Sequence, residues 1–135
     1  MRTIIINPFD QTIKEAVYGG DYREIYDLID CQMFDVVSIS ESDDLFIDDE
    51  GLLKNNNRYF SWSGRNFAGK ALILSHNDEG VSIGTTYDLH EVVDRVEWLP
   101  EGHRETPYME FSILSWIKRK LKNLGKESSL YRLNG

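Results

Sequence analysis

The alternation of apolar and polar residues predicts a chain built mainly of short strands. A β-branched run at 3–7 precedes a second strand-like segment at 12–18, and together they predict an opening hairpin. Two further apolar segments, 34–39 and 45–47, flank a polar turn and predict a second hairpin. Hairpins of this kind are typical of an antiparallel sheet.

Four later segments also have strand patterns. Residues 59–62 are aromatic and alternate with polar positions, whereas 71–74 are wholly apolar and predict a buried central strand. Residues 81–85 are expected to pair back onto that strand, and 96–99 are predicted to form the last strand. The glycine-containing stretch 64–70 is interpreted as a connection between strands.

Helical spacing occurs in three places. A short helix is expected after Asp21, which can cap it, and another after Thr86 or Asp88. The longest helical pattern is 107–124, with Thr106 placed as N-cap. The sequence therefore predicts an α+β fold: mainly an antiparallel sheet of hairpins, with two short helices and one long C-terminal helix.

Charge divides the chain of 135 residues into two parts. Residues 1–100 hold 8 bases and 19 acids, a net charge of −11, whereas residues 101–135 hold 7 bases and 4 acids, a net charge of +3. We interpret 1–100 as an acidic α+β body and 101–135 as a linker, a basic amphipathic helix and a tail. An acidic body repels nucleic-acid phosphate, so general duplex DNA binding by the body is not expected.

Targeting and redox signals are sparse. No apolar run approaches the roughly 20 residues that span a bilayer, and the N-terminus is too short for a signal peptide. Cys31 is the only cysteine, which excludes an internal disulfide. We therefore expect a soluble, cytoplasmic protein that does not bind membranes.

The stretch Gly64–Lys70 has the spacing of a phosphate-binding P-loop. Ala71 stands where that loop needs a Ser or Thr to hold Mg²⁺, and a strand follows instead of a helix. A strand connection with a turn at Gly69 is the better interpretation. Lys70 and Arg65 could still contact an anionic ligand.

The remaining candidate chemistry is weak. The acids between 41 and 50 are interrupted by the apolar run 45–47, so they do not match a calcium loop and are interpreted as two solvated turns. His76, His90 and His103 lie in separate segments, and the acidic neighbour of Cys31 disfavours a thiolate. The sequence predicts no metal site, no cofactor and no catalytic residue.

The pattern after residue 106 is the strongest candidate for a contact surface. An apolar stripe and a basic C-terminal end occur on the same predicted helix. This pattern is consistent with docking on the sheet, self-association, insertion into the groove of a partner, or a phosphate contact by the basic end. The candidate partner-binding residues are Phe111, Leu114, Trp116, Ile117, Lys118, Arg119 and Lys120.

The segments 21–29, 34–37, 45–52 and 68–74 resemble those of a group of short uncharacterised proteins encoded by bacteria, plasmids and bacteriophages. The resemblance covers about residues 1–100. Members of that group have no assigned activity, so it implies only a context, that of an accessory protein of a phage or other mobile element. The basic segment after Pro107 departs from the pattern.

Three functional hypotheses follow. The leading one is a non-enzymatic protein that binds a host or defence protein or sequesters a small ligand, with a possible homo-oligomer. The second is an acidic mimic of DNA that inhibits a nucleic-acid enzyme through Asp43, Asp44, Asp48 and Asp49. The third is a cryptic nucleotide-binding enzyme in which cations and aromatic rings clamp an anionic base; its candidate residues are Arg58, Tyr59, Trp62, Arg65 and Lys70.

Overall fold

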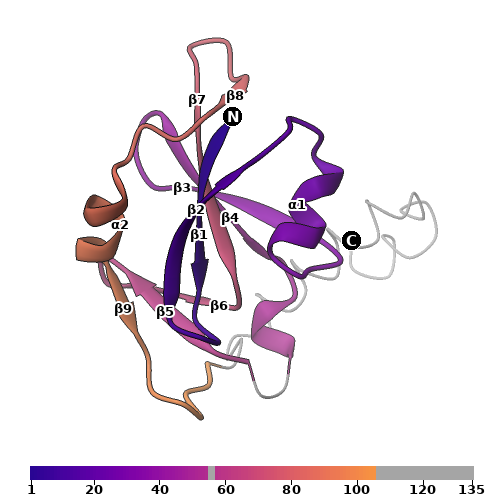
Figure 1. The fold of residues 1–135 in the computed structure, drawn as a ribbon. Coiled ribbons are helices and arrows are strands. Elements are labelled where there is room, and N and C mark those ends of the chain that lie inside the picture. Colours follow the sequence, from indigo (N-terminus) through magenta and orange to yellow (C-terminus); the bar gives the residue numbers. More distant parts are fainter. Residues whose placement is uncertain (55–56, 106–135) are drawn as a thin grey trace, which may run out of the picture. The chain divides into compact units, whose positions relative to one another are not determined.

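The computed structural model describes residues 1–54 and 57–105, and all of these except Glu105 belong to one compact unit, Met1–Arg104 (Figure 1). The strands are β1 (Arg2–Asn7), β2 (Thr12–Val17), β3 (Phe34–Ser38), β4 (Asp43–Asp48), β5 (Tyr59–Trp62), β6 (Arg65–Ala68), β7 (Ala71–His76), β8 (Ser82–Ile83) and β9 (Val96–Trp98). The helices are α1 (Arg23–Leu28), α2 (Leu89–Arg95) and the 3₁₀ turn η1 (Gly51–Leu53).

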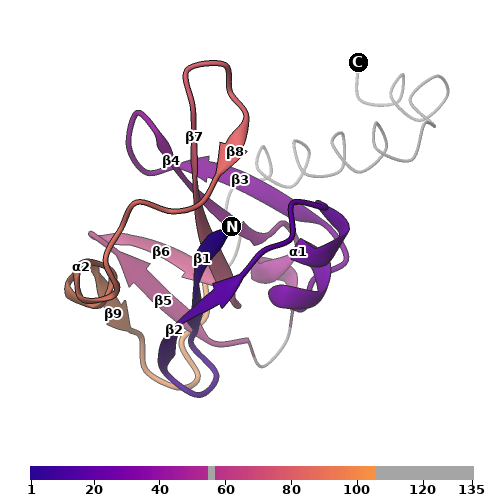
Figure 2. The ribbon, with the colours of Figure 1, turned by 45° about the horizontal axis from the view of Figure 1, so that its top comes forward.

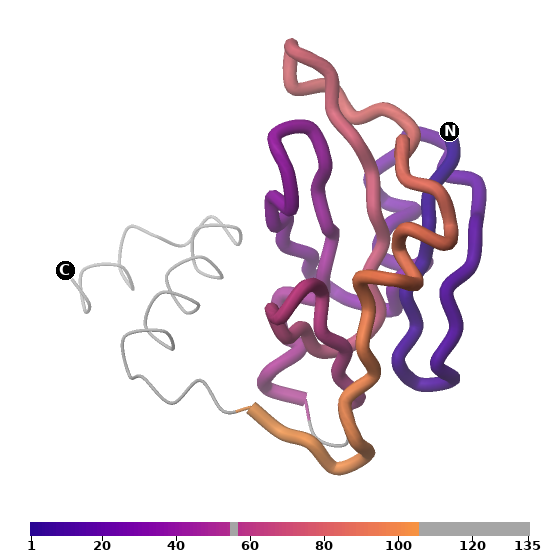
Figure 3. Tube along the Cα trace, turned by 90° about the vertical axis from the view of Figure 1, so that its left-hand side faces the viewer, coloured from indigo at the N-terminus to yellow at the C-terminus, as the bar shows by residue number. Residues whose placement is uncertain are grey.

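The larger sheet has the order β2-β1-β7-β4-β3, and β8 adds to β7 at its end. Every pairing in it is antiparallel. Figure 3 shows the β1–β2 hairpin in indigo on one side, the β3–β4 hairpin in purple on the other, and β7 between them. Both predicted hairpins and the predicted central strand are therefore confirmed.

The smaller sheet has the order β6-β5-β9 and is also antiparallel. β6 corrects the prediction that 64–70 is only a connection. It pairs with β5 across a tight turn in which Ser63 (φ 46°) and Gly64 (φ 89°) both have positive φ angles, as two-residue hairpins favour. The predicted turn at Gly69 is present, with φ 86°.

Two hydrophobic clusters fill the unit, one on each face of the larger sheet. The first lies between the two sheets and joins Ile4, Leu45 and Ile73 to Phe60 and Trp62. The second packs α1 against the opposite face, and its members include Ile25, Ile29, Phe46, Leu72 and Leu74. Val92 of α2 belongs to the first cluster, so the two helices cover opposite sides of the sheet, as Figure 2 shows.

Both short helices are present, with one difference at the first. Tyr22 is the N-cap of α1, and the expected cap Asp21 instead accepts the backbone N–H of Arg23 through its carboxylate at 3.0 Å. Asp88 caps α2 in a reciprocal capping box with Glu91, as predicted. The predicted helix 107–124 and its partner-binding residues lie outside the described residues. Within the described part of the chain, no helix is long and apolar enough to cross a membrane.

Substituting Ile73 tests the central position of β7. Ile73 is fully buried and pairs with Ile4 on one side and Leu45 on the other. Ile73→Ala is expected to lower the free energy of unfolding by about 2–5 kcal/mol, because it leaves a cavity where the two sheets meet. Val17→Ala, at a side chain that is 80% exposed on an edge strand, should cost less than about 1 kcal/mol. Urea denaturation measures both values, and equal losses would contradict the assignment of the core.

Candidate ligand-binding site

A cavity of about 390 Å³ lies at the end of the larger sheet where β1 and β4 finish and β7 begins. Its walls come from five segments that are far apart in the sequence: the β1–β2 turn, the end of α1, the end of β4, the chain around η1, and the turn before β7. The lining residues are Asn7, Phe9, Asp10, Ile29, Asp30, Asp48, Lys54, Asn57, Gly69 and Lys70. We name it the turn cavity.

Asp48 and Lys54 form an ion pair on one wall of the turn cavity. The Asp48 side chain is only 4% exposed, and its second oxygen accepts the backbone N–H of Glu50 at 2.9 Å. A buried carboxylate needs such partners, because leaving it unpaired carries a large desolvation penalty. We therefore interpret Asp48 and Lys54 as a fixed structural pair that holds the β4–η1 connection.

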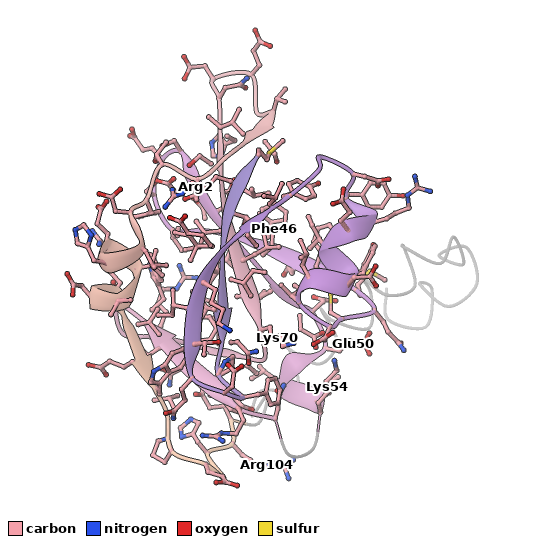
Figure 4. The ribbon with its side chains drawn as sticks, viewed as in Figure 1. Arg2, Phe46, Glu50, Lys54, Lys70 and Arg104 are labelled. Carbon is pink, nitrogen blue, oxygen red and sulfur yellow. The ribbon has the colours of Figure 1, made fainter. Side chains whose placement is uncertain are left out.

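Lys70 and Asp30 form a second ion pair. In this pair the lysine is the less exposed partner, whereas in the first pair it is the aspartate. The Lys70 side chain is 23% exposed, whereas that of Asp30 is 65% exposed. Figure 4 shows Lys70 at the start of β7, in the same region as Lys54 and Glu50. The ammonium group of Lys70 therefore lies in the wall and is held by a carboxylate that solvent reaches freely.

The backbone at the end of α1 places Asp30 opposite Lys70. Asp30 has φ 52°, and the N–H of the next residue, Cys31, donates to the carbonyl of Tyr26 at 3.0 Å. This is a Schellman helix end, in which the left-handed position is usually glycine. Aspartate here carries a small conformational cost and adds a carboxylate that reaches β7.

The rest of the wall is partly apolar and partly amide. Ile29 is buried, whereas the Phe9 ring is 49% exposed and is available to a ligand. The Asn57 side-chain amide is already used, because it donates to the carbonyl of Gly51 at 2.8 Å and accepts the N–H of Arg58 at 3.0 Å. A Cβ atom added at Gly69 would lie 3.7 Å from the side-chain amide of Asn57.

Cys31 is not a nucleophile in this environment. Its thiol is buried in the second hydrophobic cluster, as the predicted packing role requires. Desolvation by burial, followed by the negative charge of Asp48, raises the pKa of Cys31 to about 12. The thiol therefore stays protonated at neutral pH, in agreement with the expectation from its acidic neighbour.

The five residues predicted for a nucleotide clamp are not brought together. Lys70 lines the turn cavity, but Tyr59 and Trp62 are buried, and Trp62 packs edge-on against Tyr87 at 5.7 Å. Arg65 is exposed on β6 with its guanidinium over the Phe67 ring at 5.5 Å. The side-chain Nε atom of Arg58 is buried and has no hydrogen-bond partner among the described residues.

The acids at 41–50 are not all in solvated turns, which corrects that part of the prediction. Asp43 and Asp48 are buried at the two ends of β4. Asp43 accepts hydrogen bonds from the hydroxyls of Ser75 at 2.5 Å and Ser40 at 2.7 Å. Two of the four carboxylates named for a DNA-mimicking surface are thus used inside the fold. Among the described residues, no group of three or more acids, histidines or cysteines could hold a metal ion.

His76 and Asp44 form a pair beside the Asp43 network, at the other end of β7. The Nδ1 atom of His76 lies 2.7 Å from the carboxylate of Asp44. The hydrogen bond with Asp44 is the largest cause that raises the pKa of His76 above its ordinary value of 6.5. This pair therefore carries a pH-dependent part of the stability.

Residues 1–104 thus form an α+β domain with two antiparallel sheets and the turn cavity at one end of the larger sheet. Residues 1–97 match a family that is described as a domain of unknown function (DUF3846), and the chain belongs to this family. No curated protein and no solved structure matched the chain.

Removing the Asp43 carboxylate tests whether the acids of β4 are structural. Asp43→Ala leaves the buried Ser75 hydroxyl without its acceptor, so the free energy of unfolding is expected to fall by about 1–3 kcal/mol. Glu41→Ala, at an exposed position in the same turn, is the matched control and should change it by less than about 0.5 kcal/mol. If chemical denaturation gives both variants the wild-type stability, the structural role of Asp43 is wrong.

The His76–Asp44 pair predicts how the stability of the protein changes with pH. Because the folded-state pKa of His76 is raised, the pair stabilises the protein fully below about pH 6.5, and this contribution is lost as the pH rises through the folded-state pKa. Asp44→Asn should move the pKa of His76 down and remove this part of the pH dependence. An NMR titration of the His76 ring measures it, with Asp94→Asn on α2 as control. A wild-type pKa at or below 6.5 would contradict the prediction.

Proposed function

We propose that this chain is a non-enzymatic binding domain that takes a small polar ligand in the turn cavity. The observation that carries the proposal is the Lys70–Asp30 pair, in which a partly buried lysine side chain, 23% exposed, is held by an aspartate side chain that is 65% exposed. An incoming anionic group can replace Asp30 on Lys70, because the displaced carboxylate is left in water rather than in the protein interior.

The size and composition of the turn cavity support this proposal. Its volume of about 390 Å³ lies within the range of small-molecule sites, roughly 300–1,000 Å³. It combines an apolar surface, from Phe9 and Ile29, with a few polar groups. Such sites usually take most of their binding energy from the apolar wall and their orientation from the polar groups.

A binding role fits the chemistry of the wall better than a covalent one. Both lysine side chains in the turn cavity are paired with carboxylates, and the nearby thiol of Cys31 is protonated. The proposal keeps the ligand-sequestering half of the sequence-based hypothesis. Binding to a host or defence protein, a phage context and a cytoplasmic location remain predictions.

A ligand screen on the full chain tests the proposal. We expect at least one compound of a library of charged and amphoteric metabolites to shift the backbone NMR signals of Phe9, Asp30 and Lys70. Lys70→Gln should weaken that binding by about tenfold, because it removes a charge-assisted contact. Lys14→Gln, at an exposed lysine that does not line the cavity, is the control and should bind as wild type. If no compound at millimolar concentration shifts these signals, the proposal is wrong.

A further inference from the structure

A second cavity adjoins the turn cavity, and the two share wall residues. It has a volume of about 600 Å³ and is lined by Tyr26, Asp27, Cys31, Gln32 and Glu50, together with Asp30 and Lys54 of the turn cavity. Figure 4 places Glu50 and Lys54 close to Lys70, below α1. A ligand longer than the turn cavity would therefore extend past Asp30 into this second space, which we name the α1 cavity.

The two cavities differ in the charge that they offer. The turn cavity contributes Lys70, which is paired with the exposed Asp30. The α1 cavity contributes the exposed carboxylate of Asp27 and the ring of Tyr26, and its single lysine, Lys54, is already paired with the buried Asp48. Carboxylates beside an aromatic ring are suited to an ammonium or guanidinium group. One end of the combined site thus favours an anion and the other a cation.

Asp30 lies between the two ends and connects them. In the free protein its carboxylate is bound to Lys70 in the turn cavity, yet Asp30 also lines the α1 cavity. A ligand anion that takes Lys70 releases Asp30, and a ligand cation in the α1 cavity can then pair with the released carboxylate. The exchange leaves every charge with a partner, whereas a ligand with one charge leaves a protein group unpaired.

From this arrangement we infer that the ligand is a small zwitterion with a carboxylate at one end and an ammonium or guanidinium group at the other. The inference rests on the proposed function of the turn cavity. A phosphate dianion fits less well, because the turn cavity already holds the carboxylates of Asp10, Asp30 and Asp48 against two lysines. The carboxylate of the ligand contributes more than its cation, because Lys70 is the less exposed member of its pair.

Three commercial compounds separate the two charges. L-Arginine carries a carboxylate, with an α-ammonium group beside it, at one end and a guanidinium group at the other. L-Citrulline keeps the amino acid end but has a neutral urea group of similar shape in place of the guanidinium, and agmatine lacks the carboxylate. We expect L-arginine to bind most tightly, L-citrulline about threefold more weakly, and agmatine at least about tenfold more weakly. NMR titration of the full chain measures the three dissociation constants. Equal affinities for L-arginine and agmatine would overturn the inference.

Variants at the two ends assign each charge to its place. Asp27→Asn should reduce the preference for L-arginine over L-citrulline, because only the released carboxylate of Asp30 then remains for the guanidinium group. Lys70→Gln should abolish the preference for L-arginine over agmatine. Arg23→Gln, at an exposed arginine on α1 that lines neither cavity, is the control and should retain both preferences. A wild-type preference over L-citrulline in Asp27→Asn, or a wild-type preference over agmatine in Lys70→Gln, would contradict the assigned positions.

Asp30→Asn provides a readout that a purely structural role of Asp30 does not predict. Without the competing carboxylate on Lys70, L-citrulline should bind about threefold more tightly than it binds the wild type. Weaker binding of L-citrulline to a folded Asp30→Asn variant would overturn the exchange of ion pairs. If other compounds of the screen shift the turn cavity but none of these three does, the zwitterion inference fails and the proposed function stands. If nothing in the screen shifts that cavity, both fail.

Discussion

The burial of β7 on both faces is the constraint on which the rest of this domain depends. Ala71 and Ile73 point to the cluster between the two sheets, and Leu72 and Leu74 point to the cluster under α1. A strand that is apolar on both sides is stable only when a layer covers each face and a strand pairs with each edge. The smaller sheet and α2 provide one layer, α1 provides the other, and β1 and β4 provide the edges. The central position of β7, between β1 and β4, follows from this requirement.

Because of the same constraint, the charged and polar residues lie at the two ends of β7. Charged groups cannot lie along a strand that is covered on both faces, so Lys70 precedes it, and the serine and histidine at 75–76 end it. At the C-terminal end of β7, the side chains of Ser75 and His76 bind the carboxylates of Asp43 and Asp44 on β4. At the N-terminal end of β7, the five segments that form the walls of the turn cavity meet around Lys70. Hydrogen bonds therefore fill one end, and the turn cavity lies at the other.

The sequence predicted the elements that depend on residues close together in the chain, and it missed the contacts between distant residues. The two hairpins and the second short helix depend on neighbouring residues, so turn chemistry and apolar spacing were sufficient to predict them. The cap was predicted as Thr86 or Asp88, and the structure has Asp88. β6 was missed because its four residues, Arg65–Ala68, do not alternate clearly, and only the turn at 63–64 signals a hairpin. Asp43 and Asp48 looked like solvent-exposed acids because their partners, Ser75 and Lys54, become neighbours only after folding. The cavity could not be predicted from the sequence for the same reason. The expectation that Lys70 and Arg65 could contact an anionic ligand stays a prediction, and of the two only Lys70 lines the cavity.

The two lysine pairs in the turn cavity show why burial, rather than the number of charges, separates a structural contact from a binding contact. In the Asp48–Lys54 pair the anion is buried, so removing its partner leaves an uncompensated charge in the interior, and a ligand gains nothing by competing. In the Asp30–Lys70 pair the anion is exposed, and an exposed ion pair contributes at most about 1 kcal/mol. A ligand carboxylate that makes the same contact and also buries apolar surface on Phe9 therefore needs only a modest gain to replace Asp30. Under the proposed function, the turn cavity thus contains one lysine that the fold holds in place, Lys54, and one whose carboxylate partner a ligand replaces, Lys70.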